Sequence, residues 1–194
     1  MPIALDNLDW MSFNVSLAIA GVVFGWIYYY LNNKLSYIFL PLWILFLPNT
    51  IYLLTDIEHF IAQLPKVSGQ EEQIIILQYI VLFIIGIVSY LLAMRPLSKF
   101  FKAIRIDPTG DLALAIIAIL NFAIGLALVL GKFQRTHSWY VFTDPLVVVS
   151  DVLEIFYTPN LLAMFFFCGL ITNLVYLIYH FTLVRSNSKK HKKR

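Results

Sequence analysis

The stretch IIILQYIVLFIIGIVSYLLAM, residues 74–94, decides the fold class of this chain. It has about the 20 apolar residues that an α-helix needs to cross the hydrocarbon core of a bilayer. It carries no charged side chain, and its length exceeds that of a single strand. Residues 74–94 are therefore predicted to form a transmembrane helix.

Four further stretches have the same character, and the five together predict an all-α fold, a polytopic integral membrane helix bundle. The composition also indicates a membrane protein. Of the 194 residues, 60% are hydrophobic and 13% are charged, whereas a soluble domain has about 25% charged residues. A single cysteine, Cys168, excludes a disulfide scaffold. The expected spans lie near residues 13–31, 36–54, 74–94, 112–131 and 161–184.

The basic residues predict the orientation, because they favour the cytoplasmic side of a membrane. With the C-terminus inside, 11 of the 14 Lys and Arg residues fall on that side. We expect a multi-pass protein of the cell membrane with its N-terminus outside and its C-terminus in the cytoplasm. Residues 1–184 would form a single transmembrane domain, and residues 185–194 a basic, disordered cytoplasmic tail.

The connections between spans carry local signals. Asp144 followed by Pro145 is typical of a helix start, and we predict a short helix over residues 145–157 that lies in the outer membrane interface. A re-entrant helix is the alternative. On the inner side, residues 107–111 read DPTGD, which predicts a turn with Asp111 as the N-cap of the fourth span.

A polar stripe at the outer end of the second span is the strongest candidate site. In PNTIYLLTDIEH, residues 48–59, a proline and an asparagine are expected to interrupt the apolar helix. If the chain stays helical, most of the polar side chains fall within about 80° of arc. They could form a packing network, a ligand or catalytic site, or a solvated helix end. The residues are Asn49, Tyr52, Asp56, His59 and Gln63, flanked by Thr55.

A second cluster lies at the outer end of the fourth span. Lys132 and Arg135 are basic residues on the less basic side, so a local acidic partner is expected. Asp56 is the obvious one, and we expect its side chain within about 6 Å of Arg135. His137 and Trp139 follow at headgroup depth, where Trp139 would also suit an aromatic belt.

Small and polar residues inside the spans predict close helix packing and hydrogen bonds between helices. Gly21 and Gly25 form the small-residue motif GxxxG in the first span. The candidate packing positions are Asn14, Gly21, Gly25, Ser89, Asn121 and Asn173.

The two clusters resemble motifs of the domain-of-unknown-function 1361 family of bacterial integral membrane proteins. The resemblance covers about residues 13–181. It implies a bacterial inner membrane and one shared polar site on the outer face, to which Ser138 then belongs, and it implies no activity. The matching residues are Leu47, Pro48, Asn49, Tyr52, Thr55, Asp56 and His59, then Gly131, Phe133, Arg135, Ser138 and Trp139.

Two departures from the family pattern concern the second cluster. Lys132 replaces the first arginine of the family's Gly-Arg-Phe-x-Arg run. Tyr140 stands where the family usually has an aspartate after Ser-Trp. A carboxylate of the family site is therefore missing here or moved, and Asp144 is the nearest replacement.

Three functions follow from these patterns. A structural, assembly or partner-binding membrane subunit ranks first, because no motif with a defined reaction is present. The alternative is a membrane-embedded enzyme or binder in which Asp56 or His59 acts as general base and Lys132 with Arg135 holds an anionic lipid. A small transporter is weaker, since no charge lies at mid-depth. We expect the lipid bilayer and a membrane protein as partners, and no cofactor, metal or nucleic acid.

The orientation is directly testable. A cysteine placed at Ser188, in a chain whose Cys168 has been replaced, should react with an impermeant maleimide only from the cytoplasmic side. Labelling of intact cells from outside would reverse the topology.

Overall fold

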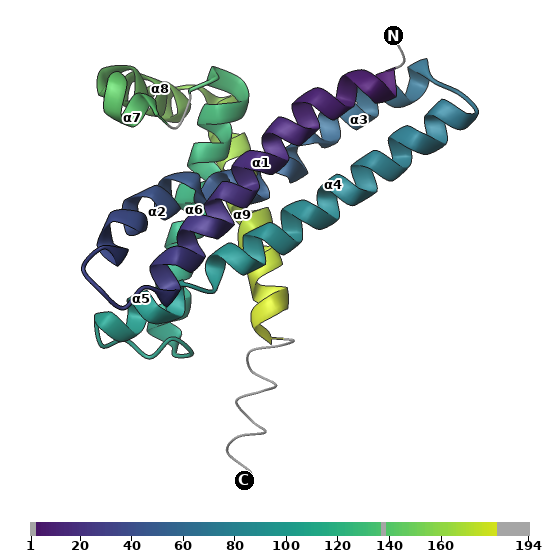
Figure 1. Ribbon diagram of the computed structural model, residues 1–194. Coiled ribbons are helices and arrows are strands. Elements are labelled where there is room, and N and C mark those ends of the chain that lie inside the picture. The colour runs from purple at the N-terminus through teal and green to yellow at the C-terminus, as the bar shows by residue number, and fades with distance from the viewer. Residues whose placement is uncertain (1–2, 137–138, 182–194) are drawn as a thin grey trace. The chain divides into compact units, whose positions relative to one another are not determined.

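The computed structural model describes residues 3–136 and 139–181, and every regular element within these ranges is helical (Figure 1). Five helical stretches are long and apolar enough to cross a membrane. This confirms the predicted class, a polytopic membrane protein built from helices. The stretches are Ile3–Tyr30, Ser36–Lys66, Gln70–Ala103, Asp111–Gln134 and Pro159–Tyr179.

The first helix, α1 (Ile3–Tyr30), begins well before the predicted boundary at residue 13. The predicted boundary assumes that the helix begins where the apolar run begins. Asp6 and Asp9 are exposed on α1 while Ala4 and Met11 are buried, so the helix continues as an amphipathic segment. A helix end is set by packing as well as by hydropathy, which explains the difference.

The second span is composite. It runs through α2 (Ser36–Tyr52), a 3₁₀ turn η1 (Leu53–Asp56), α3 (Ile57–Gln63) and a final 3₁₀ turn η2 (Leu64–Lys66). The expected interruption at Pro48 and Asn49 is wrong, because both residues lie inside α2. Proline removes one backbone donor, a loss that helices packed in a membrane protein tolerate. The change of helix type comes later, at η1.

The remaining helices follow the predicted order. The third span forms α4 (Gln70–Met94), and α5 (Leu97–Ala103) follows it. The helix expected over residues 145–157 is confirmed as α8 (Pro145–Tyr157). Residues 182–194, which include the end of the predicted fifth span and the tail, lie outside the described residues. The others are α6 (Asp111–Val129), the π-helical turn η3 (Leu130–Gln134), α7 (Tyr140–Thr143) and α9 (Pro159–Tyr179).

The turn before α6 is built on Asp107. The Thr109 backbone N–H and hydroxyl donate to Asp107 Oδ1 at 3.0 and 2.9 Å, and they hold the pKa of that carboxyl below its usual range. The N-cap position is Gly110, so the prediction of Asp111 as N-cap is wrong by one residue. Asp111 instead lies in the first turn, where its charge favours the helix dipole.

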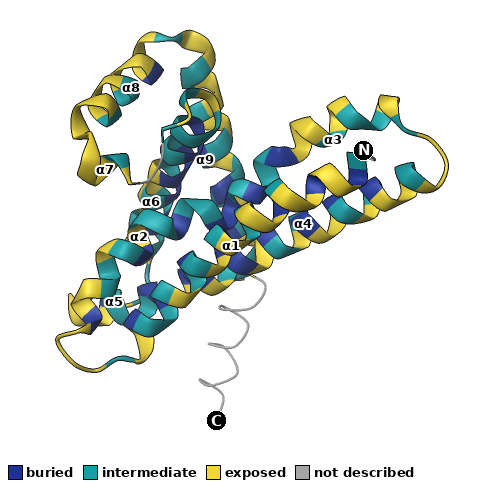
Figure 2. Ribbon diagram, turned by 45° about the horizontal axis from the view of Figure 1, so that its top comes forward, coloured by how far each residue is buried: buried dark blue, intermediate teal, exposed yellow. Residues whose placement is uncertain are grey.

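The chain forms two compact units, residues 1–95 and 96–194. The expected grouping of residues 1–184 into a single domain stays a prediction. In the first unit α1 lies along α4, and buried positions follow the sides on which the two helices pack (Figure 2).

Apart from Tyr90 and Met94 on α4, the buried residues of α1 and α4 follow steps of three and four, which is the spacing of a coiled-coil seam. On α4 the seam includes Ser89, one of the predicted packing residues, which is buried. On α1 the half-buried Asn14 completes the series. The α1 positions are Ala4, Asn7, Met11, Ala18, Gly21, Gly25 and Tyr28, and the α4 positions are Ile75, Tyr79, Leu82, Gly86, Ser89 and Ala93.

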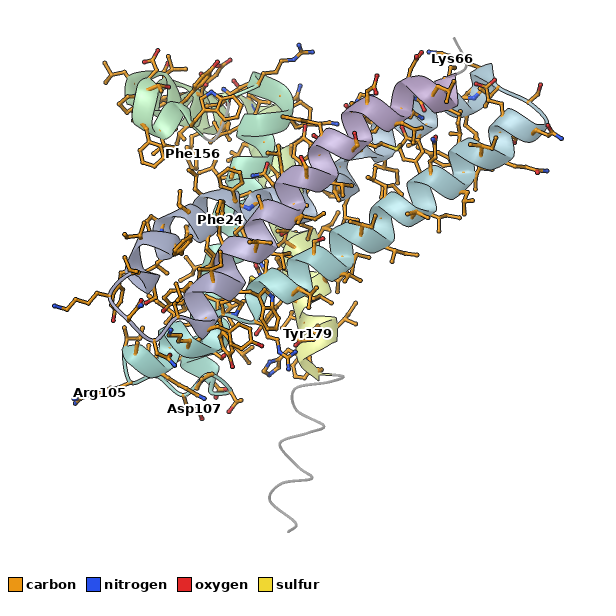
Figure 3. The ribbon with its side chains drawn as sticks, in the orientation of Figure 1. Phe24, Lys66, Arg105, Asp107, Phe156 and Tyr179 are labelled. Atoms are coloured by element: carbon orange, nitrogen blue, oxygen red, sulfur yellow. The ribbon has the colours of Figure 1, made fainter. Side chains whose placement is uncertain are left out.

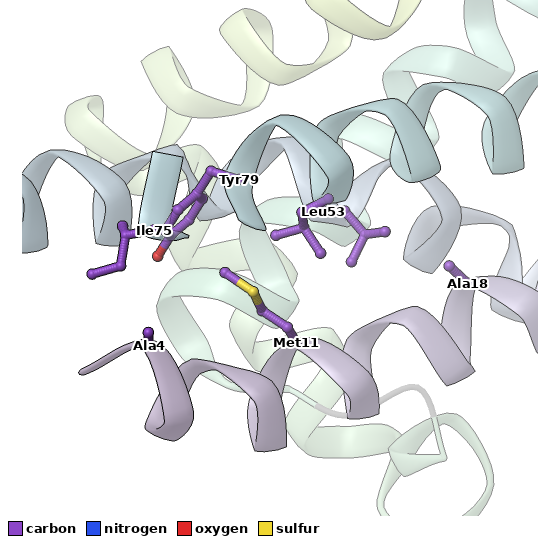
Figure 4. Packing of buried hydrophobic residues seen from close by; sticks show 7 residues of the cluster. Ala4, Met11, Ala18, Leu53, Ile75 and Tyr79 are labelled. Carbon is purple, nitrogen blue, oxygen red and sulfur yellow. The ribbon is translucent and has the colours of Figure 1, made fainter. Parts of the chain in front are cut away.

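The seam brings helices close at small residues. A Cβ added at Gly21 would lie 2.8 Å from the carbonyl oxygen of Phe46, so α1 and α2 nearly touch there. A Cβ added at Gly86 would likewise lie 3.1 Å from the Leu53 Cβ. Toward the other end, Met11 and Leu53 pack with Ile75 in a continuous apolar cluster (Figure 4).

The second unit is built on the pair α6 and α9. A Cβ at Gly125 would lie 2.6 Å from the backbone nitrogen of Gly169, so the two backbones cross in contact. One turn away, Asn121 Nδ2 donates to Asn173 Oδ1 at 3.1 Å. Asn173 Nδ2 in turn donates to the Ala118 and Gly169 carbonyls. Small residues thus allow α6 and α9 to approach each other closely, and hydrogen bonds of the amides hold the two helices in place.

The crossing predicts a large response to one methyl group. Gly125→Ala should destabilise the protein by about 1–3 kcal/mol, because the neighbouring atoms are backbone and cannot rotate away. Ala115→Leu, which adds bulk at an exposed position of α6, is the control. Unfolding by graded denaturing detergent measures both, and equal stability of the two variants would contradict the close crossing.

Candidate functional site

Two primary amides face each other at the N-terminal end of α1. Asn7 Nδ2 donates to Gln63 Oε1, and Gln63 Nε2 donates back to Asn7 Oδ1, both at 2.9 Å. Asn7 is buried at a seam position of α1, and Gln63 is the last residue of α3. The reciprocal pair therefore joins the first helix to the end of the second span.

Three more side chains complete what we call the amide cluster, which consists of Asn7, Trp10, Gln63, Gln78 and Tyr79. Trp10 Nε1 donates to Asn7 Oδ1 at 3.1 Å, and the Tyr79 hydroxyl donates to Gln63 Oε1 at 3.2 Å. Gln78 accepts from Asn7 at 3.4 Å and donates to the Ala4 carbonyl at 2.8 Å. The cluster thereby links α1, α3 and α4.

Asp56 lies in η1 and is 1% exposed. Asn14 Nδ2 donates to its Oδ2 at 3.3 Å, which brings a predicted packing residue to a predicted site residue. A buried carboxylate is costly unless hydrogen bonds or charges stabilise it. Asp56 therefore requires hydrogen-bond partners such as Asn14 to be stable at its buried position.

His59 has a different environment from Asp56. Its side chain is 49% exposed and lies 3.8 Å from Glu58 Oε1, while its ring contacts the Trp10 ring at a centroid distance of 5.3 Å. The 3₁₀ turn changes the rotation per residue between the two, so the polar stripe does not continue on one face. Asp56 points into the unit, and His59 reaches its surface.

The other stripe residues bond locally. Asn49 Nδ2 donates to the Phe46 carbonyl at 3.4 Å, and Thr55 Oγ1 donates to the Tyr52 carbonyl at 2.6 Å. Such bonds to the preceding turn satisfy a hydroxyl or amide inside an apolar helix. Tyr52 itself is half-buried.

The second predicted cluster belongs to the other compact unit. Lys132 lies half-buried in η3, and Arg135 is exposed with a left-handed backbone at φ 56° directly after that turn. The Trp139 and Tyr140 rings pack edge to face. His137 and Ser138 lie outside the described residues. The proximity of Asp56 and Arg135 stays a prediction.

No group of three or more His, Cys, Asp or Glu side chains arranged to hold a metal ion is found in residues 3–136 and 139–181.

Comparison with known families adds a family assignment. The model of a family described as protein of unknown function, DUF1361, matches residues 13–175, which is most of the chain. The chain belongs to the DUF1361 family. No curated protein and no solved structure matches it.

Within this DUF1361 member, sequence reasoning identifies Asn14, Asp56 and Gln63 but misses the partners of Gln63. Asn7 precedes the predicted first span, so the sequence gives no reason to expect its amide to be buried and hydrogen-bonded. Gln78 is the one amide in the run IIILQYIVLF, residues 74–83, and that isolation is the signal that could have found it. Tyr79 and Trp10 resemble ordinary apolar residues until a partner is known.

A double-mutant cycle tests the amide pair. Asn7→Leu and Gln63→Leu should each lower stability by about 0.5–2 kcal/mol, because each removes the reciprocal hydrogen bonds that the opposite amide makes with it. The double variant should lose less than the sum. Gln73→Leu removes an exposed amide of α4 and is the control. Additive losses in unfolding experiments would show that the two amides do not interact.

Proposed function

We propose that this protein is a structural or partner-binding subunit of the cell membrane, with its amide cluster on the extracytoplasmic side. The observation that carries the proposal is the reciprocal Asn7–Gln63 pair. Primary amides do not ionise near neutral pH, so the pair offers no acid or base for a reaction. Its donors and acceptors are used within the protein, which favours a role in holding three helices together.

Helix lengths support a position of the cluster near the membrane boundary. α1 has 28 residues and α4 has 25, which correspond to about 42 and 37 Å at 1.5 Å per residue. The hydrocarbon core is about 30 Å thick. One end of each helix therefore extends beyond it, and the exposed Asp6 and Asp9 favour the N-terminal end of α1.

A rigid protruding end suits a docking function. If all five stretches cross, alternation puts residues 64–69 and 130–158 on the same side. By the distribution of basic residues this is the extracytoplasmic side. An end reinforced by hydrogen bonds keeps its shape outside the bilayer, where packing between transmembrane helices no longer supports it. A membrane protein partner is the occupant that we propose for it.

A second candidate function rests on Asp56. Asp56 is buried, and the half-exposed His59 follows it three residues later in the chain. Carboxylate and imidazole groups serve in proton transfer, and ionisable groups within membrane helices often mark functional sites. In this alternative, Lys132 and Arg135 hold an anionic lipid, and Asp56 or His59 acts as general base.

Thermal unfolding in nanodiscs separates the two candidates. For a structural role, Asp56→Asn should lower the unfolding temperature, because the buried carboxylate loses charge-dependent hydrogen bonds. His59→Ala should have a small effect, since that side chain is half exposed. Asp9→Asn, which removes an exposed carboxylate of α1, is the control and should leave the temperature unchanged.

The opposite result supports the second candidate. Functional groups are often held at a cost in stability, so their removal leaves stability unchanged or raises it. An Asp56→Asn variant that melts at or above the wild-type temperature would contradict the structural role. The next comparison would be phosphatidylglycerol binding by wild type and Arg135→Ala, with each protein embedded in nanodiscs that contain this lipid.

A further inference from the structure

Helix α8 is fixed by its polar side to the end of α6. Gln134 Nε2, in the π-helical turn η3, donates to the Asp151 carbonyl and to Glu154 Oε2, both at 3.0 Å. The Thr136 hydroxyl donates to the Asp151 carboxylate. Ile155 is fully buried on the same side. One side of α8 is therefore occupied within its own unit.

The opposite side of α8 is an exposed apolar stripe. At 100° per residue, five large apolar side chains fall within about 100° of arc. All are exposed, from Leu146 at 80% and Tyr157 at 83% to the remaining three at about half. Figure 3 shows the Phe156 side chain projecting from the helix. The stripe consists of Leu146, Val149, Leu153, Phe156 and Tyr157.

We propose that this stripe binds the acyl-chain boundary of one bilayer leaflet, so that α8 is an in-plane membrane anchor held to α6 by Gln134. The proposal goes beyond the docking function above and does not depend on it. The occupant is lipid rather than a protein or a second copy of the chain, for two reasons.

The first reason is continuity with a surface that faces lipid. The Phe156 ring contacts Phe165 of α9 at a centroid distance of 6.0 Å, and Phe165 contacts Phe166 at 4.9 Å. Phe166 is half exposed on α9, one of the five stretches apolar enough to cross the membrane. The apolar stripe therefore continues through these rings into the exposed face of a span.

The second reason is charge. Residues 139–160 contain three acidic side chains, Asp144, Asp151 and Glu154, and no Lys or Arg. Attraction to anionic headgroups cannot hold such a helix at the membrane, so the apolar area must do so. Binding to lipid should therefore be independent of anionic lipid, which distinguishes α8 from a basic surface helix.

The polar contacts also argue against the re-entrant alternative. Asp151 and Glu154 are held at the terminal turn of α6 by Gln134. A re-entrant path would carry both carboxylates into hydrocarbon, where acidic side chains are costly. An in-plane helix keeps them at the polar boundary while its stripe enters the leaflet.

Site-directed spin labelling tests the anchor in phosphatidylcholine nanodiscs. Single cysteines at Val149 and Ser150, and at Leu153, are introduced with Cys168→Ala. The adjacent pair differs by 100° of helix rotation. Labels at Val149 and Leu153 should be accessible to oxygen and protected from a water-soluble nickel complex, and the label at Ser150 should show the reverse. Adding phosphatidylglycerol should not change the pattern.

Two outcomes would overturn the proposal. Access of the nickel complex to Val149 and Leu153 would mean a solvated stripe, and protection from both reagents would mean a protein partner or a second copy. If Cys168→Ala unfolds the protein, a benzophenone side chain at position 153, with position 150 as control, replaces the labels. Lipid adducts at position 153 alone support the anchor, whereas protein adducts or none contradict it.

Discussion

The first unit depends on one geometric constraint, the alternation of three and four residues along the buried side of α1. An α-helix returns to the same face after seven residues with only a small drift. Ala4, Met11 and Ala18 follow this repeat, and Gly21 and Gly25 continue it. Alanine and glycine at four of these positions leave room for a neighbouring helix, and at Gly21 the backbone of α1 lies close to that of α2.

Apolar seams leave the register of helices poorly specified, and the amides remove that freedom. Shifting α1 lengthwise against its neighbours would exchange one apolar contact for another. It would also break the bonds of Asn7 with Gln63, and a buried amide without a partner is expensive. Asn121 and Asn173 have the corresponding position between α6 and α9. Each unit thus combines close contact at small residues with one amide pair that selects the register.

The sequence predicts what depends on local signals and fails where contacts between distant residues decide. Residues 74–94 and the helix over 145–157 are predictable because hydropathy, length and a proline at the helix start are local. The start of α1 and the 3₁₀ turn at Leu53–Asp56 are set by packing against other helices, which no single stretch contains. Asp56 could be identified by its cost in a membrane, but Asn14 as its partner required the fold.

The position of Asp56 at a change of helix type explains why one carboxylate can be buried there. A 3₁₀ turn alters which backbone carbonyls and amides are used and rotates the following residues. The stripe predicted from a continuous helix is thereby divided, with Asp56 turned inward and His59 outward. A regular helix would have left both at one surface, so the irregular turn creates the buried acidic position. Its burial beside Asn14 is the feature that a structural and a catalytic role would share, and the stability of the Asp56→Asn variant separates them.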